Sequence, residues 1–439
     1  MSSSPSGSCA KCGKHTSLQC AGCKGAPEYF PGDVKSIFYC SIACQRAHRM
    51  IHKPDCMSMT RRKKLLRTAI VAKEAFLVYR AVEYDLELSK IERRGETLYL
   101  SDNQKNLDIP PRRGPFPEHL TANPVYREAA LTWFQCNAAH ALSSRLINKL
   151  LTDVPCAIEM FLLRIGKPHF ITQVIPGPDS PNIPSLDAST MPHSVLKVDL
   201  QLSSFTESWI VDLTGARYGF QEVLVPFLKY TENKECELAG PPESFDLTQT
   251  HDLNILIEEY PSGVRRAIAC AERPARLRFA AFVDTIDKKI LEGSLGEFEN
   301  KLSVFRLALR QHMSNNTQRY KTGYSGKVHL ETSGALNHIT HDSRMMILMF
   351  FLTLAATALA APSLHTREDL KYVRVTVQQH RITTKKQIVV KDSSTEDIFG
   401  SACSNALKPG FLPTSVSSQM LGLTGEGNIT AGPPYLQRP

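Results

Sequence analysis

The residues best suited to chemistry gather near the start of the chain, where seven of the 12 cysteines lie between positions 9 and 56. Two pairs follow the spacing C-x2-C, in which a tight turn presents two thiolates to the same side. Two further pairs are four residues apart, so on a helix the members of each pair would share one face. Together these positions supply eight metal-ligating side chains: Cys9, Cys12, Cys20, Cys23, Cys40, Cys44, His52 and Cys56.

Eight such ligands are enough for two four-coordinate zinc sites, and closed sites of this kind are structural rather than catalytic. The residues before Cys9 include neither a basic stretch nor an apolar one, so we expect no secretory signal. In a reducing compartment, clustered cysteines bind metal more often than they form disulfides. The sequence therefore predicts two bound Zn²⁺ ions, with Gly13 and Gly22 at positive φ in the two turns.

This pattern resembles the MYND zinc finger, through the two C-x2-C pairs and the segments Tyr39–Gln45 and His52–Cys56. The loop between Lys24 and Tyr39 is longer than is usual for the family. The resemblance implies interleaved sites, with one zinc on Cys9, Cys12, Cys40 and Cys44. The other zinc would bind Cys20, Cys23, His52 and Cys56.

The resemblance also implies a function, since MYND-like fingers bind short proline-containing peptides of partner proteins. Gln45 lies where the family contacts peptide, and Arg49 stands where the family commonly has tryptophan. We predict both as peptide-binding residues, and an arginine at that position favours an acidic peptide. His48 lies one helical turn from Cys44 and from His52, so it is either a competing ligand or a solvated helix residue.

A second group of residues could carry catalysis. Cys136 on a predicted helix, His193 before a strand and Asp212 at the end of the next strand resemble the arrangement of papain-like and transglutaminase-like cysteine enzymes. In such enzymes a thiolate attacks an acyl carbon, and a histidine held by a carboxylate activates it. Cys136 is expected inside its helix, whereas such nucleophiles usually begin one. The alternative is a buried thiol, an ordinary histidine and a turn-capping aspartate, and we expect the chain to bind rather than to catalyse.

The elements that would position these residues follow from hydrophobic periodicity. A long helix is predicted from Met59 to Arg94, and a second from Val125 to Leu151. Strands are predicted at 159–165, 170–175, 194–202 and 208–212, followed by helices at 253–271, 277–291 and 297–313. The fold class is therefore α+β, with a dense motif at Trp209–Phe220.

We divide the chain into a finger at 1–57, an α+β body at 58–235 and a helical segment at 236–344. An apolar helix at 345–361 and a tail at 362–439 complete it. Strands are expected at 372–390, and from Ser393 onward the composition is typical of disorder.

The net charge of +9 is a mild excess for 439 residues, and it does not indicate nucleic-acid binding as the main role. The basic run Arg61–Lys64 is either a nuclear address, a patch for an acidic partner or a solvated helix turn. We expect an intracellular protein of the nucleus or cytoplasm. Residues 345–361 carry no charge and would span about 25 Å as a helix, so a membrane-associated segment is the alternative to a core helix.

Overall fold

The computed structural model describes residues 6–34, 37–104, 111, 113–180, 191–202 and 205–323. The predictions for 345–361, 372–390 and the tail lie outside these residues. Within them, no helix is both long enough and apolar enough to cross a membrane. The described residues form a small N-terminal finger followed by a mixed α+β body, as the sequence predicts.

The long helix α1, Ile42–Val82, belongs to both parts of the molecule. Its N-cap is Ser41, whose hydroxyl accepts a hydrogen bond from the backbone N–H of Cys44 and so satisfies one free donor of the first turn. The helix begins in the finger, where few of its residues are buried, and most of its residues are buried from about Leu65, where it enters the body. The helix predicted at 59–94 is thus wrong at both ends, because α1 starts earlier and a strand replaces its last part.

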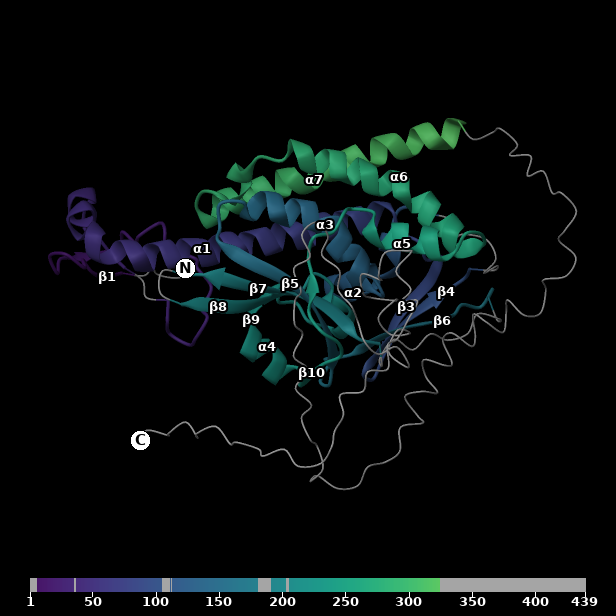
Figure 1. The fold of residues 1–439 in the computed structure, drawn as a ribbon, viewed down its shortest axis with the longest axis horizontal. Helices are drawn as coiled ribbons and strands as arrows, with labels where there is room; N and C mark the ends of the chain where they lie inside the picture. Colours follow the sequence, from purple (N-terminus) through teal and green to yellow (C-terminus); the bar gives the residue numbers. More distant parts are fainter. Residues whose placement is uncertain are drawn as a thin grey trace, which may run out of the picture. The chain divides into compact units, whose positions relative to one another are not determined.

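Near its N-terminal end, α1 contains a proline and is bent. Pro54 lies inside the helix, where it cannot donate the i→i−4 hydrogen bond. Figure 1 shows that the N-terminal turns of the helix are inclined to the rest. A proline in a helix is a common cause of such a bend.

The body is built on an antiparallel sheet whose order is β10-β5-β7-β8-β9, with β11 also pairing with β5. Every neighbouring pair in it is antiparallel, and β5 and β7 pair from Cys156↔Leu200 to Leu163↔His193. The strands are β5 (Cys156–Ile165), β7 (His193–Gln201), β8 (Thr206–Val211), β9 (Leu224–Pro226), β10 (Cys236–Leu238) and β11 (Glu243–Ser244).

A smaller sheet has the order β3-β4-β6. The hairpin of β3, Leu88–Arg94, and β4, Thr97–Asp102, turns at Gly95, whose φ of 58° suits glycine. β4 alternates half-buried and buried residues, and it pairs in parallel with β6, Ile171–Pro176. The sequence-based prediction missed this hairpin.

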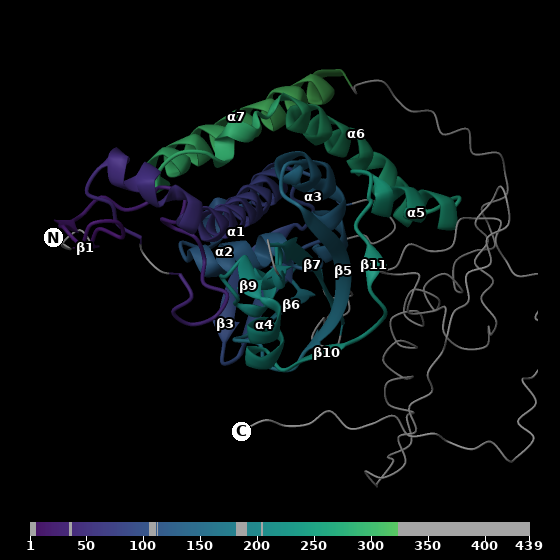
Figure 2. The ribbon, with the colours of Figure 1, turned by 60° about the vertical axis from the view of Figure 1, so that its left-hand side comes forward.

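Helices cover both faces of the main sheet. Figures 1 and 2 show α1 and α3 between the sheet and the outer helices α6 and α7, whereas α4 lies on the opposite side. The large apolar cluster lies on the side of α1 and α3, and a smaller one around Phe161, Ile210 and Tyr230 lies under α4. The helices are α2 (Pro124–Thr132), α3 (Cys136–Leu151), α4 (Phe227–Asn233), α5 (His251–Glu259), α6 (Val264–Thr285) and α7 (Leu295–Gly323).

Three predicted helices are each divided in the structure. The helix expected at 125–151 breaks between α2 and α3, where Phe134 has a φ of 56°. That value lies in the left-handed region, which a continuous α-helix cannot include. The helices expected at 253–271 and 277–291 are replaced by α5, the longer α6 and the short 3₁₀ turn Lys288–Leu291, whereas 297–313 lies within α7.

Candidate metal centre and thiol site

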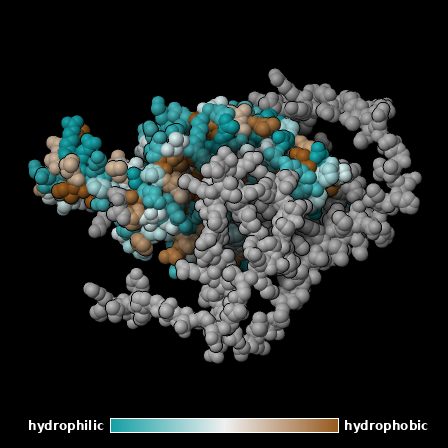
Figure 3. Space-filling view, in the orientation of Figure 1, coloured by the Kyte–Doolittle hydropathy of each residue, from teal (hydrophilic) through white to brown (hydrophobic). Residues whose placement is uncertain are grey.

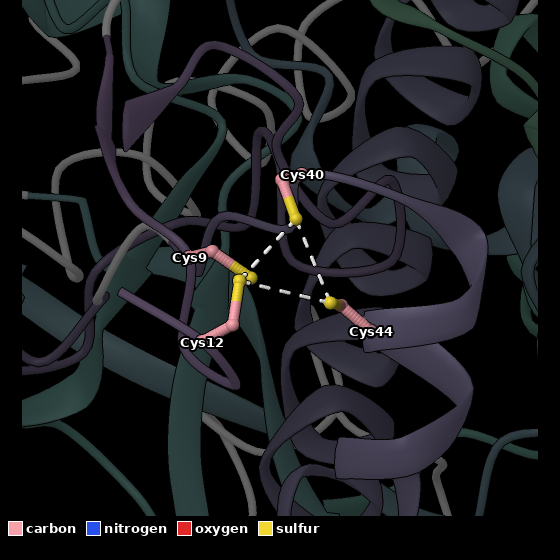
Figure 4. A group of neighbouring side chains, drawn as sticks. All are labelled: Cys9, Cys12, Cys40 and Cys44. Carbon is pink, nitrogen blue, oxygen red and sulfur yellow. Dashed lines mark hydrogen bonds between the residues drawn. The ribbon is translucent and has the colours of Figure 1, made fainter. Parts of the chain in front are cut away.

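The first group of ligands joins the N-terminal turn to the start of α1. Cys12 Sγ lies 3.4 Å from Cys40 Sγ and 3.8 Å from Cys44 Sγ, and Cys40 Sγ lies 3.5 Å from Cys44 Sγ (Figure 4). The four ligand atoms all lie within 4.8 Å of one another; they belong to Cys9, Cys12, Cys40 and Cys44.

The second group joins the next C-x2-C turn to the same helix. His52 Nε2 lies 3.3 Å from Cys23 Sγ and 3.4 Å from Cys20 Sγ, while Cys20 Sγ lies 3.7 Å from Cys56 Sγ. His52 and Cys56 are four residues apart on α1 and share a face, as predicted. The two groups alternate along the chain, so the predicted interleaving is confirmed.

Both groups fit a tetrahedral zinc ion. With Zn–S bonds of about 2.3 Å, the sulfur atoms of a tetrahedral site lie about 3.8 Å apart, close to the distances observed here. Thiolate and imidazole are ligands that zinc prefers. In each group all four ligand atoms come from the protein, so neither site keeps an open position for a substrate.

The electrostatics of the thiols also favour a cation. The backbone N–H of Cys40 lowers the pKa of Cys9 to about 6, while hydrogen bonds with Cys12 and Cys44 raise the pKa of Cys40 to about 12. In the second group, burial and the neighbouring thiolates raise the pKa of Cys23. The four thiols of the first group, and the three of the second, cannot all ionise side by side without a positive charge between them. A divalent ion in each group would supply that charge.

Residues 9–56 match the model of the MYND finger family. The chain carries a MYND finger. No curated protein and no solved structure matches the chain. MYND fingers bind two zinc ions and act as protein-interaction modules, so the predicted cofactor, two Zn²⁺, is confirmed.

The two glycines of the MYND finger serve different purposes. Gly13 has a φ of 75°, as predicted for the first turn. Gly22 is not among the residues with positive φ, so that prediction was wrong. A Cβ at Gly22 would lie 2.5 Å from Cys56 Sγ, so glycine is needed there to make room for a zinc ligand.

His48 belongs to neither group of ligands. Its Nδ1 lies 3.0 Å from the hydroxyl of Tyr39, and its ring stacks near that of His52. The half-buried His48 is therefore held beside Tyr39 and His52 and is not simply solvated. Such neighbours help to orient metal ligands.

A groove of about 590 Å³ runs along the exposed side of α1 in the MYND finger. Both predicted peptide-binding residues, Gln45 and Arg49, line it, and the side-chain amide of Gln45 is 3.8 Å from Cys20 Sγ. Asp153 and Val154 of the body also line it. The remaining side chains that line the groove come from the finger and α1: Cys20, Ile42, Arg46, His52, Lys53, Cys56, Met57, Thr60, Arg61 and Lys64.

The basic run at Arg61–Lys64 fixes the MYND finger to the body. Arg62 is buried and its guanidinium donates to Glu207 at 2.8 Å, and it also forms an ion pair with Asp33 at 2.7 Å. Arg61 and Lys63 donate to backbone carbonyls of β7 and of the second C-x2-C turn. The run is therefore not a solvated helix turn, because one of its members is a buried ion-pair partner.

The long loop of the MYND finger contributes to the same interface. The ring of Tyr29 lies 5.2 Å from that of the buried Trp209, and its hydroxyl accepts the backbone N–H of Ser208 at 3.3 Å. Asp33 belongs to this loop as well. The extra length of the loop thus reaches β8 of the body.

Two members of the second predicted group, His193 and Asp212, meet inside the body. His193 begins β7 and Asp212 follows β8, and His193 Nε2 lies 3.0 Å from Asp212 Oδ1. Cys136 is the first residue of α3, not a residue well inside a helix as the sequence-based prediction had it. Its side chain is buried, with 8% of its surface exposed.

Sequence reasoning missed three residues around this group. Tyr230 of α4 donates its hydroxyl to Asp212 Oδ2 at 2.7 Å, and the backbone of Thr214 donates to Oδ1 at 3.1 Å. His140 lies on α3, and burial lowers its pKa to about 4 although the backbone of Ser194 opposes the shift. The spacing of Cys136 and His140, one helical turn, was the signal available for the latter.

Proposed function

We propose that the protein recruits a partner protein, and that its MYND finger holds an acidic peptide of that partner in the groove along α1. The observation that carries this proposal is the lining of the groove. It contains five basic side chains, namely Arg46, Arg49, Lys53, Arg61 and Lys64, against one carboxylate, Asp153.

Apolar side chains lie beside these charges. Ile42 and Met57 line the groove and are 68% and 45% exposed, and Met50 and Ile51 are exposed on the same helix. Figure 3 shows apolar and polar surface side by side on the part of the molecule that contains the finger. Exposed methionine and isoleucine next to arginine are typical of surfaces that bind peptides. The expected peptide therefore combines carboxylates with apolar residues.

The bound zinc ions prepare this surface but take no part in chemistry. Cys20, His52 and Cys56 line the groove from within, so the second zinc site forms part of its floor. Loss of zinc would remove the fold that presents Gln45 and Arg49. We infer that the finger works inside the cell, in the nucleus or the cytoplasm, where its thiols stay reduced.

Fluorescence anisotropy with the full chain tests this proposal. The probe is a labelled peptide that combines glutamates with a Pro-Leu pair, and the comparison peptide carries lysines in place of the glutamates. We expect the acidic peptide to bind and the basic one not to bind. Binding should weaken as salt rises, because salt screens exposed charges.

Charge reversal locates the binding surface. Arg46→Glu combined with Arg49→Glu should weaken acidic peptide binding by roughly tenfold or more, since like charges would then face each other. Lys229→Glu and Arg164→Glu make the same charge change on exposed residues outside the groove and should leave binding unchanged. Equal binding by all variants, or no binding of the acidic peptide, would refute the proposal.

A further inference from the structure

A buried histidine–aspartate pair lies at the start of β7. His193 is fully buried and Asp212 is 2% exposed, so the 3.0 Å contact between them is shielded from water. Although burial opposes ionisation, His193 and then Tyr230 hold the pKa of Asp212 well below its usual range. Asp212 is therefore a carboxylate and can only accept hydrogen bonds. The proton of a neutral His193 consequently lies on Nε2, and its Nδ1 carries a free lone pair.

The local backbone is shaped around this carboxylate. Gly215 approaches so closely that a Cβ there would lie 2.3 Å from Asp212 Oδ2. The Thr214 N–H and the Tyr230 hydroxyl complete the hydrogen bonds of Asp212. A buried carboxylate with this many donors is fixed in position, so it fixes the orientation of the imidazole as well.

The second nitrogen of His193 has no such partner. Among the described residues, Nδ1 of His193 makes no hydrogen bond, although the ring is completely buried. An unsatisfied polar atom in this position costs folding free energy and calls for an explanation. A proton acceptor held for a neighbouring acid is one such explanation.

Cys136 and His193 share a neighbour in Tyr218, and the Cys136 thiol itself donates to Asn137 Oδ1 at 3.7 Å. The ring of Tyr218 is 5.2 Å from the ring of His193, and Tyr218 also interacts electrostatically with Cys136. His140, one turn further along α3, interacts electrostatically with His193 and Asp212. The face of α3 that carries Cys136 therefore lies over the beginning of β7.

The position of Cys136 in its helix suits a nucleophile. It is the first residue of the 16-residue helix α3, and no side chain caps this helix at Gln135. The partial positive charge at a helix N-terminus stabilises a thiolate. The backbone N–H groups of a first turn also lack partners within the helix, so they can bind the oxyanion of a reacting carbonyl.

We propose that Cys136, His193 and Asp212 form a thiol-dependent acyl-transfer site for an amide carbonyl at the end of a slender chain, such as a glutamine side chain. We infer a slender substrate because only 8% of the surface of Cys136 is exposed. The proposal is independent of peptide binding by the MYND finger.

The reaction has two balanced steps. His193 Nδ1 takes the proton of the Cys136 thiol, and the thiolate adds to the carbonyl carbon. The C–N bond then breaks, the amine leaves with the proton from Nδ1, and a thioester remains on Cys136. In the second step water, or a primary amine, gives a proton to Nδ1 and attacks the thioester, which releases the acid or a new amide and restores the thiol.

The first experiment titrates the thiol directly, so that access to the site does not matter. The ultraviolet thiolate absorption of zinc-loaded Cys136→Ser is subtracted from that of the zinc-loaded wild type across the pH range. The ionisable groups that interact with Cys136 or His193, directly or through one neighbour, are Asp212, His140, Arg217, Tyr218, Tyr230 and Lys234. We expect a midpoint well below the ordinary thiol value of about 8.5, and a return toward that value in His193→Ala. A wild-type midpoint at or above about 8.5 would overturn the proposal.

The second experiment follows acyl transfer. The full chain is treated with 4-nitrophenyl acetate near neutral pH, and acetylated peptides are mapped by mass spectrometry. The Cys136 peptide should be acetylated at least tenfold faster than that of the exposed Cys270, and this advantage should disappear in His193→Ala. Equal rates at Cys136 and Cys270 would count against the site. Tyr230→Phe should slow acylation and leave the zinc content unchanged.

Discussion

The finger and the body of this protein reach a stable interior in different ways. The buried cluster of the finger consists of Cys9, Cys20, Cys23 and Tyr39, with few other apolar side chains packed against it. The body instead buries a large cluster that extends from Leu65 to Met313 and includes the fully buried Trp209. The finger therefore depends on bound ions for its fold, and the body depends on packing.

This difference changes how a cysteine should be interpreted in each region. In the finger, three or four ligand sulfurs lie in each group, and metal binding accounts for them. In the body, Cys136 belongs to no such group among the described residues, and it interacts with Tyr218, a neighbour of the His193–Asp212 pair. The same side chain is thus a ligand in one region and a candidate nucleophile in the other.

Removal of the metal should give the largest difference in stability between the finger and the body. Cys23→Ser should reduce the zinc content from two ions per chain to one, and a strong chelator should remove both. Because zinc binding provides on the order of 10 kcal/mol of folding free energy per site, the finger should become sensitive to proteases. Metal analysis and limited proteolysis measure both effects. The body beyond Leu65 should stay resistant, and its digestion at the same rate would contradict the comparison.

Loss of the ion pair between Arg62 of α1 and Glu207 of the body should give the next largest effect on stability. Arg62→Met leaves Glu207 buried without its partner, although the indole N–H of Trp209 still donates to it at 3.2 Å. Breaking a buried pair in this way typically costs about 3–5 kcal/mol. Urea unfolding of the full chain measures the loss. Arg61→Met, which removes a half-buried neighbour, is the matched control and should cost less than about 1 kcal/mol.

Acid should weaken the body through His140. Its folded pKa of about 4 lies below the value of about 6.5 in an unfolded chain, so the unfolded state takes up the proton first. The stabilisation is complete above pH 6.5 and is lost as the pH falls toward 4, by roughly 3 kcal/mol. His140→Leu should flatten this part of a stability–pH curve. An unchanged curve would mean that His140 is not the titrating group.

A substitution that relieves backbone strain at Phe134 should give the smallest effect on stability. Phe134 has a positive φ and its ring lies 5.6 Å from that of Trp133. Phe134→Gly should stabilise the body by up to about 1 kcal/mol, since glycine adopts this conformation without strain. Phe134→Ala keeps the strain and loses the ring, so it should be less stable than the glycine variant. Thermal unfolding compares the two.

The sequence predicted the finger well because its ligands are local. Each of the four ligand pairs lies within one turn of chain, so spacing alone indicates which side chains can meet. The MYND resemblance then supplied the pairing of turns with helix positions. The sequence could not reveal that the long loop carries Tyr29 to Trp209, because this contact joins residues 180 positions apart.

The body was harder to predict for identifiable reasons. The break before Cys136 involves neither glycine nor proline, so periodicity continued through Phe134 and concealed the start of α3. The hairpin at Gly95 did have a signal, since β4 alternates in burial, but it followed directly on a strongly helical stretch. Asp212 was found from its place after a strand, whereas Tyr230 could be linked to it only by the fold.

The helix α1, although bent near Pro54, is continuous from the finger into the body and so limits the movement of any partner bound to the finger. Its 41 residues span a contour of about 60 Å without an intervening linker. Its N-terminal end belongs to the finger, and its C-terminal end is packed in the core of the body. A partner bound to the N-terminal turns of α1 would therefore keep a fixed orientation relative to the body, unlike a partner bound through a flexible linker. Spin labels on Lys53 and Lys229 should then give one narrow distance distribution, with or without a bound partner.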